Sequence, residues 1–380
     1  MKQILLILTI FLTLTCNGQE TKQDNFKLTV SPIIDQTDNT NKAIIESLTE
    51  FLKTKNSALT ENKYWIQSDF QKFIYPYLDI YNIENSKHEI GLYRPTLMEI
   101  IPTENSRQKI VKIAFIRHNS RTQENQLKAI YNLIANCSQD KILFSRYLDY
   151  ATEKWNTIHK EDLTYKITPN RSASETEIAA QQSDIEKIVQ FFNCSRISIT
   201  FYSCVNPIEL FEIKGFDYNP MMYIDKTGGF ADYGNIIFSG NNAEIYTHEI
   251  IHIYTSNLFP KIDKFIDEGL ATFMAGSGKY NYEWHRNKLD KFLQENKNFN
   301  LAEHTDPYDR IYFENETSIP YLTAALIVER TWKIYGKDKL LELLKSERDL
   351  WATLKTVGLT KESINIELRK FIKQPLTVKF

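Results

Sequence analysis

The segment Thr247–His252 has the pattern His-Glu-x-x-His, with His248, Glu249 and His252 at its fixed positions. Two histidines four residues apart on a helix lie on one face, one turn apart. Both imidazoles can then reach a single tetrahedral zinc ion at about 2.0–2.1 Å from each nitrogen. Glu249 is the type of residue that takes a proton from a zinc-bound water. The pattern predicts a metal site, although two helix histidines with a solvated glutamate would look the same.

A candidate third ligand, Glu268, lies in the downstream segment Phe265–Phe273. A catalytic zinc needs three protein ligands and one position for water, and His, His and Glu form a known set. The chain can turn at Asn257–Pro260 and bring a second helix back across the first. Gly269 and Ala271 are small, as expected where two helices approach closely. We therefore expect His248, His252 and Glu268 to hold one zinc ion.

These motifs resemble those of the gluzincin metallopeptidases, which include thermolysin and the aminopeptidase N-type enzymes. The resemblance is strongest to the peptidase MA-like group, in which H-E-x-x-H is followed by E-G-x-A-x-[YF], here Glu268–Phe273. It covers roughly residues 140–345. It implies zinc ligation by His248, His252 and Glu268, a water polarised by Glu249, and hydrolysis of a peptide or protein substrate.

The resemblance also suggests an oxyanion donor, Tyr321. Aminopeptidase N-like gluzincins carry a tyrosine at the start of a comparable helix, and its hydroxyl steadies the tetrahedral oxyanion. This chain has Ala324 where the Y-x-x-G pattern of that helix has glycine. The alternative is an aromatic residue on the apolar face of a core helix. Other side chains that could donate instead are Tyr308, Tyr312, His285 and His304.

A candidate substrate-binding strand precedes the zinc helix, as the active-site edge strand does in gluzincins. Gly228–Ala231 comes first, and the candidate residues Asn235, Ile236, Ile237 and Phe238 follow. An edge strand can bind an extended peptide through main-chain hydrogen bonds. The alternative is a core strand between glycine turns. The aminopeptidase signature G-x-M-E-N has no counterpart before the zinc helix, so we expect an endopeptidase.

The elements that must position these residues form an α+β metallopeptidase domain over residues 141–380, with a mixed sheet, then a helical subdomain, and the zinc between them. Asn241, with Glu244 three residues later, predicts the start of the zinc helix. Helical periodicity continues to about Lys373, broken at Asn296–Ser318. Upstream, the patterns predict helices at 144–155 and 174–192 and strands at 163–168, 196–202, 223–225 and 235–238.

Residues 41–140 predict a small α+β accessory domain, since 380 residues favour two domains. Apolar residues at helical spacing cover 44–52, and a second helical segment covers 65–80, interrupted by Pro76. Three strands follow at 92–101, 110–117 and 126–134.

Residues 1–19 are typical of a signal peptide, because the apolar run Ile4–Leu14 is too short to span a bilayer. Leu12–Cys16 resembles a bacterial lipobox with Cys16 as the lipidated residue, and cleavage at nearby small residues is the alternative. Residues 20–40 predict a polar linker. We expect an exported protein, in the cell envelope as a lipoprotein or else periplasmic or secreted, whose membrane contact is through that anchor alone.

Composition excludes one class of partner and leaves one competing function. The formal net charge is −2 and the lysines are dispersed, so no basic surface for nucleic acid is expected. Beyond Cys16 there are three cysteines, Cys137, Cys194 and Cys204; a pair between the last two or three buried thiols are both compatible with the sequence. The competing function is a lipid-anchored envelope binding protein with a structural or inactive zinc centre.

Overall fold

The computed structural model describes residues 26–119, 122–138, 141–309, 311–313, 317–378 and 380. The candidate signal peptide and Cys16 lie outside these residues, and so export and lipidation stay predictions. The chain divides into two compact units. The first holds the described residues up to Ile66, with Tyr77–Ile130 and Ile134–Ser145; the second holds Gln67–Pro76, Tyr131–Leu133 and Arg146–Phe380.

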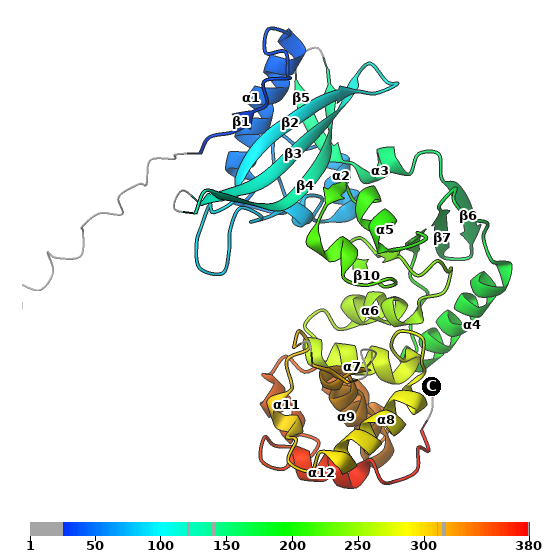
Figure 1. Ribbon diagram of the computed structural model, residues 1–380. Coiled ribbons are helices and arrows are strands. Elements are labelled where there is room, and N and C mark those ends of the chain that lie inside the picture. The colour runs from blue at the N-terminus through cyan, green and yellow to red at the C-terminus, as the bar shows by residue number, and fades with distance from the viewer. Residues whose placement is uncertain (1–25, 120–121, 139–140, 310, 314–316, 379) are drawn as a thin grey trace, which may run out of the picture. The chain divides into compact units, whose positions relative to one another are not determined.

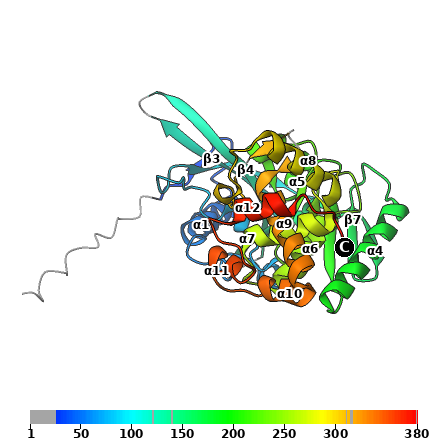
Figure 2. The same ribbon diagram turned by 90° about the horizontal axis from the view of Figure 1, so that it is seen from below.

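The first unit packs helix α1 (Asn39–Thr54) beside a sheet (Figure 1). The carboxylate of Asp38 accepts a hydrogen bond from the Asn41 N–H at 2.8 Å and so caps the helix. The strands lie in the order β1-β2-β3-β4-β5. Figure 2 shows β3 and β4 as one long twisted hairpin. The bounds are β1 Thr29–Val30, β2 Arg94–Pro102, β3 Gln108–Asn119, β4 Glu124–Cys137 and β5 Ile142–Arg146.

Two expectations for the N-terminal part need correction. The segment expected to be a polar linker contains β1, which pairs in parallel with β2 through Thr29 and Thr96. The second expected helical segment is shorter, with α2 at Gln67–Phe73 and the 3-10 turn η1 at Leu78–Ile80. Pro76, which has no backbone N–H to donate to a helix, lies between these two pieces.

The second unit begins with a mixed sheet of order β10-β11-β8-β7-β6. Strands β7 and β8 are parallel and therefore need a crossover, which α4 (Glu175–Phe192) provides. The strand bounds are β6 Asn156–Lys160, β7 Leu163–Ile167, β8 Ile199–Ser203, β10 Gly229–Asp232 and β11 Ile236–Ser239.

The expected helix at 144–155 is wrong: that stretch holds the end of β5 and the short α3 (Leu148–Ala151). The expected strand at 223–225 is also wrong, because the 3-10 turn η2 (Pro220–Tyr223) ends there. Helix α5 (Pro207–Ile213) and strand β9 (Phe216–Tyr218) precede this turn.

Helices follow the sheet, and Figure 1 shows β10, α6, α7 and then α8 and α9 one after another. Helices α7 and α9 come very close at Gly269, where a Cβ atom would lie 2.5 Å from Ala324. The glycine that permits this approach is therefore on α7, and α9 can carry alanine. The bounds are α6 Thr247–Leu258, α7 Lys264–Ala275, α8 Tyr282–Glu295, η3 Leu301–Glu303, β12 Tyr312–Phe313, β13 Thr317–Ser318, α9 Ile319–Tyr335, α10 Lys337–Leu344, α11 Leu350–Lys355 and α12 Ile364–Phe371.

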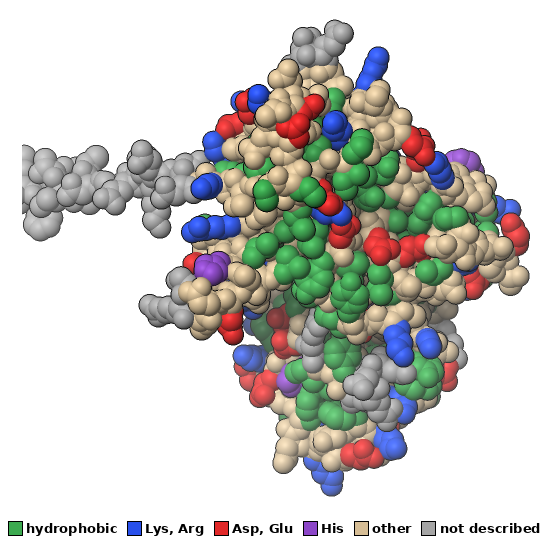
Figure 3. Space-filling model, turned by 45° about the horizontal axis from the view of Figure 1, so that its top comes forward, with side chains coloured by type: hydrophobic (Ala, Val, Ile, Leu, Met, Phe, Trp, Pro, Cys, Tyr) green, Lys and Arg blue, Asp and Glu red, His purple; other side chains and the backbone are tan. Residues whose placement is uncertain are grey.

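The expected α+β fold class is confirmed by these helices and two mixed sheets. The apolar side of the second unit's sheet and the helices α4, α6, α7 and α9 contribute to one hydrophobic core. None of the helices in the described part of the chain has the length and hydropathy of a membrane span. On the face shown in Figure 3, charged side chains of both signs are interspersed.

Candidate metal centre

Helix α6, which carries His248 and His252, is placed by the polar face of α4. Glu177 accepts from the Glu244 N–H at 2.9 Å, and Gln181 accepts from the Tyr246 N–H at 2.7 Å. Asp184 accepts from the Thr247 hydroxyl at 2.7 Å. These α4 residues recur at positions i, i+4 and i+7, which lie on one side of a helix. The segment leading into α6 is thus fixed immediately before His248.

The expected start of α6 at Asn241 is wrong. The helix begins at Thr247, and the Asn241 side chain accepts from the Gly228 N–H at 2.7 Å. Glu244 is buried, and its carboxylate accepts from Arg171, Ser174 N–H and the Ser203 hydroxyl. Both side chains that suggested a capping box are used for tertiary contacts instead.

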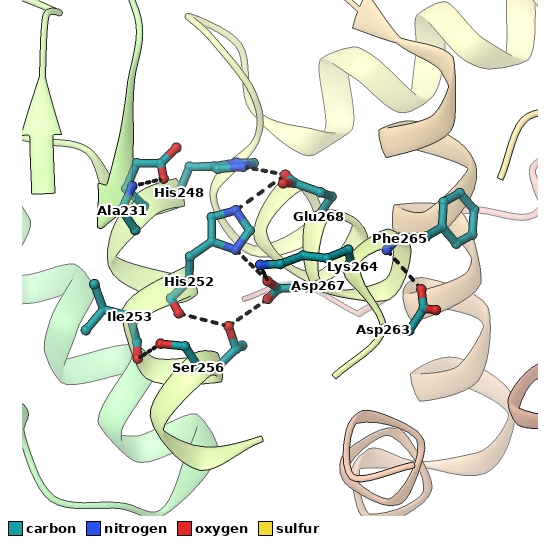
Figure 4. Close-up of polar contacts among 12 residues, drawn as sticks. Ala231, His248, His252, Ile253, Ser256, Asp263, Lys264, Phe265, Asp267 and Glu268 are labelled. Carbon is teal, nitrogen blue, oxygen red and sulfur yellow. Dashed lines mark hydrogen bonds and ion pairs between the residues drawn. The ribbon is translucent and has the colours of Figure 1, made fainter. Parts of the chain in front are cut away.

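His248, His252 and Glu268 come together where α7 crosses α6. The Oε2 atom of Glu268 lies 3.3 Å from Nε2 of His248 and 3.3 Å from Nε2 of His252. Figure 4 shows both imidazoles turned toward this carboxylate. In a tetrahedral site with bonds of about 2.0–2.1 Å, ligand atoms lie about 3.3–3.4 Å apart. The distances from Glu268 to the two histidines therefore match those between zinc ligands.

Each imidazole is oriented through its other ring nitrogen. Nδ1 of His248 lies 2.9 Å from the carbonyl oxygen of Gly276, which can only accept, so Nδ1 carries a proton and Nε2 is the nitrogen that a metal ion would bind. Nδ1 of His252 lies 3.0 Å from Oδ2 of Asp267, as an ion-pair contact rather than a well-aligned hydrogen bond. Partners of this kind fix the ring orientation of metal-bound histidines.

Asp267 is itself held firmly. It is buried, and it accepts a hydrogen bond from the Thr255 hydroxyl at 2.6 Å and from Lys264 Nζ at 3.2 Å. Burial disfavours ionisation, but the contact with His252 and the charge of Lys264 keep the pKa of Asp267 below its usual value. The only signal for Asp267 in the sequence is its place beside Glu268.

The charges around His252 favour a cation. Burial works against a charged imidazole, but Asp267, Glu268 and Glu249 raise the pKa of His252 well above its usual value. Burial likewise opposes ionisation of Glu268, yet the two histidines hold the pKa of that carboxyl far below its usual range. A buried group of carboxylates needs positive charge, from protons or from a metal ion. The donor set thus fits a divalent cation.

Glu249 has the position expected of a general base. It is 8% exposed, and one of its carboxylate oxygens lies within 4.8 Å of ligand nitrogens of His248 and His252. Its Oε2 atom accepts a hydrogen bond from the Ala231 N–H at 2.8 Å, so β10 orients the carboxylate. Among the described residues, the group whose ligand atoms lie close enough to share a metal ion is His248, Glu249 and His252. Glu268 is our candidate for the third ligand because its Oε2 atom is equidistant from both Nε2 atoms.

The prediction that Asn235, Ile236, Ile237 and Phe238 form the substrate edge is wrong. Strand β11 pairs antiparallel with β10 on one side and parallel with β8 on the other, so its main chain has no free edge. The last strand on this side of the sheet, among the described residues, is β10. Its Ala231 N–H already points away from β11, toward Glu249. A peptide added to this side of the sheet would therefore meet β10.

Tyr321 lies in the first turn of α9, beside the metal-ligand candidates. Its ring is stacked over that of His248, with centroids 6.3 Å apart and planes inclined by 14°. Burial first, and then the charge of Glu268, raise the pKa of Tyr321 above its usual value, so the hydroxyl is a donor at neutral pH. The side chain is partly buried.

The other donors suggested by sequence are placed differently. His285 is buried, with Nε2 2.8 Å from the Ser277 carbonyl oxygen. His304 stacks on Phe299 with ring centroids 4.5 Å apart. Tyr308 and Tyr312 are exposed, and the charge of Tyr312 contributes to the raised pKa of Tyr321, so it is the nearer alternative.

Comparison of the chain with models of protein families gives no match, and comparison with curated proteins gives none either.

Proposed function

We propose that this chain is a zinc-dependent peptidase, with His248, His252 and Glu268 as metal ligands and Glu249 as the general base. The observation that carries the proposal is the pair of 3.3 Å distances from Glu268 Oε2 to the two Nε2 atoms, with Glu249 beside them. Zinc bound there would polarise a peptide carbonyl and lower the pKa of a bound water.

The chain's own residues supply the proton transfers of amide hydrolysis. Glu249 would take a proton from the attacking water and pass it to the nitrogen that leaves as the carbon–nitrogen bond breaks. The Ala231 N–H holds Oε2 of Glu249, which keeps the carboxylate oriented for this transfer. The Tyr321 hydroxyl would donate to the oxygen that becomes negative. Strand β10 offers main-chain groups to an extended substrate.

The test combines metal content with hydrolysis of a mixed peptide library. We expect the parent chain to bind about one zinc ion. The variant Glu249→Gln should keep this zinc but lose hydrolysis, because glutamine keeps the shape of the side chain and removes the base. Glu268→Ala should lose the metal, since two imidazoles alone bind zinc weakly. Hydrolysis at the parent rate in Glu249→Gln would refute the assigned base. Zinc binding by a parent that cleaves no peptide would favour the competing function, a binding protein with an inactive centre.

A further inference from the structure

His285 is a buried histidine that the proposed chemistry does not use. It lies in the first turns of α8 and is 0% exposed. Its Nε2 atom is 2.8 Å from the carbonyl oxygen of Ser277. Because a carbonyl oxygen only accepts, Nε2 of His285 must carry the proton in this contact.

Ser277 belongs to the short turn between α7 and α8, residues 276–281. Its N–H donates to the Tyr280 carbonyl at 3.1 Å, and its own carbonyl accepts from the Tyr280 N–H at 3.3 Å. Gly276 has φ +79°, and a Cβ atom there would lie 2.1 Å from the Tyr280 oxygen. The turn is therefore tight, and its planar peptide groups cannot reorient independently.

The same turn carries the acceptor that orients a metal ligand. The Gly276 carbonyl oxygen lies 2.9 Å from Nδ1 of His248. The peptide group that supplies this oxygen joins Gly276 to Ser277. It is held on one side by the Ser277 N–H bond to Tyr280, and the following peptide group is held by His285.

We propose that His285 is a positioning residue for the metal ligand His248, acting through the turn at Gly276 and Ser277. His285 fixes the Ser277 carbonyl, the turn then fixes the Gly276 carbonyl, and that carbonyl keeps the proton of His248 on Nδ1. Nε2 of His248, 3.3 Å from Oε2 of Glu268, is thereby left as the nitrogen available to a metal ion. The inference rests on the proposed metal centre, but it concerns metal affinity and does not require peptidase activity.

The test replaces His285 with residues whose side-chain amide can take the place of one of its two ring nitrogens. The side-chain amide of glutamine reaches the place of Nε2, whereas that of asparagine reaches only the place of Nδ1. We would measure zinc affinity by chelator competition and the visible spectrum of the cobalt-loaded chain for His285→Gln, His285→Asn and His285→Leu. We expect the Asn and Leu variants to bind zinc about 10- to 100-fold more weakly, and Gln to restore affinity to within about 3-fold of the parent.

Tyr282→Phe is the matched control, one turn earlier on the same helix. It loses a buried hydrogen bond from its hydroxyl to Glu329 at 2.7 Å but none to the turn. We expect this variant to lower the melting temperature of the metal-free chain and to leave zinc affinity unchanged.

Two results would overturn the inference. Parental affinity and cobalt spectrum in the Asn and Leu variants would make His285 a packing residue only. Equal weakening of zinc binding in the Gln and Asn variants would lead to the same conclusion. A parent that binds neither metal would instead overturn the metal centre, and this inference with it.

Discussion

The proposed role of Tyr321 as an oxyanion donor depends on its hydroxyl group. Tyr321 stacks over His248 through its ring, and phenylalanine would keep this contact. The hydroxyl is thus the only group that Tyr321→Phe removes. Its loss tests transition-state stabilisation with little change in packing.

We expect Tyr321→Phe to lower peptide turnover by about 100-fold, the effect of removing one oxyanion donor. Zinc content and melting temperature should stay near the parental values. Tyr312→Phe serves as a control, because Tyr312 is exposed at the neighbouring hairpin. Turnover should be measured per zinc-loaded molecule. Parental turnover in Tyr321→Phe together with a loss in Tyr312→Phe would transfer the donor role to Tyr312.

The sequence was informative about the candidate metal ligands and much less so about the residues that orient them. His248, His252 and Glu268 were predictable because metal geometry restricts residue type and spacing. Asp267 was not, since neighbours on a helix point about 100° apart and only the crossing of α6 and α7 brings both carboxylates to the histidines. The Gly276 carbonyl has no side chain that could signal its role.

At the scale of elements, α4 acts as a support for α6. Tyr246, at the N-cap of α6, provides no side-chain cap, and its N–H is bonded by Gln181 of α4. Gln181 also donates to the Thr247 hydroxyl at 3.3 Å and is fully buried. These partners are more than sixty residues apart in the chain, so no local pattern predicts the contact.

Replacing Gln181 with Met should separate this support from packing, because methionine has a similar size and no hydrogen-bonding amide. We expect a loss of about 1–3 kcal/mol in the free energy of unfolding, from the partly buried Tyr246 N–H left without a partner. Zinc affinity should fall as well, since the start of α6 would shift. Urea unfolding and chelator competition measure the two effects. Gln190→Met, at an exposed position of α4, should change neither; equal behaviour of the two variants would contradict the role of Gln181.

The order of strands could have been foreseen in part. Ile236–Ser239 is buried at every position, and a continuous apolar run is typical of a strand covered on both faces. Gly229–Asp232 is half-buried and contains glycine and aspartate, which suits the edge of a sheet. The resemblance favoured β11 as the edge, whereas burial alone would have favoured β10.

At the scale of the whole molecule, the chain path mixes the two units. Gln67–Pro76 and Tyr131–Leu133 belong to the second unit, although the residues around them belong to the first. The predicted single boundary near residue 140 misses these two segments, because sequence patterns show local periodicity and not long-range contacts. Acid stability is a property that depends on such distant contacts within the second unit.

Asp232, at the end of β10, connects distant parts of the second unit. Its Oδ2 atom lies 3.0 Å from a guanidinium nitrogen of Arg146 and 3.3 Å from Nζ of Lys214. Burial alone would raise the pKa of Asp232, but Lys214 and Arg146 outweigh it and lower the pKa from 3.8 to about 2. Because the folded pKa lies below the unfolded value, the ionised carboxylate stabilises the fold above about pH 4, and this contribution is lost as the pH falls through 2. A shift of this size corresponds to about 2 kcal/mol.

We therefore expect Asp232→Asn to lower the free energy of unfolding most at neutral pH and progressively less below pH 4. At neutral pH the variant leaves the buried Arg146 and Lys214 without their carboxylate, so its deficit should be at least the roughly 2 kcal/mol of the pKa shift. Urea midpoints of the full chain at pH 7, 5, 4 and 3 would follow the difference between parent and variant. Asp149→Asn is the control, since its pair with Lys72 is exposed and should contribute little at any pH. A difference between parent and Asp232→Asn that stayed constant down to pH 3 would show that the carboxylate stabilises the fold by packing or hydrogen bonding alone, without the charge of its two buried partners.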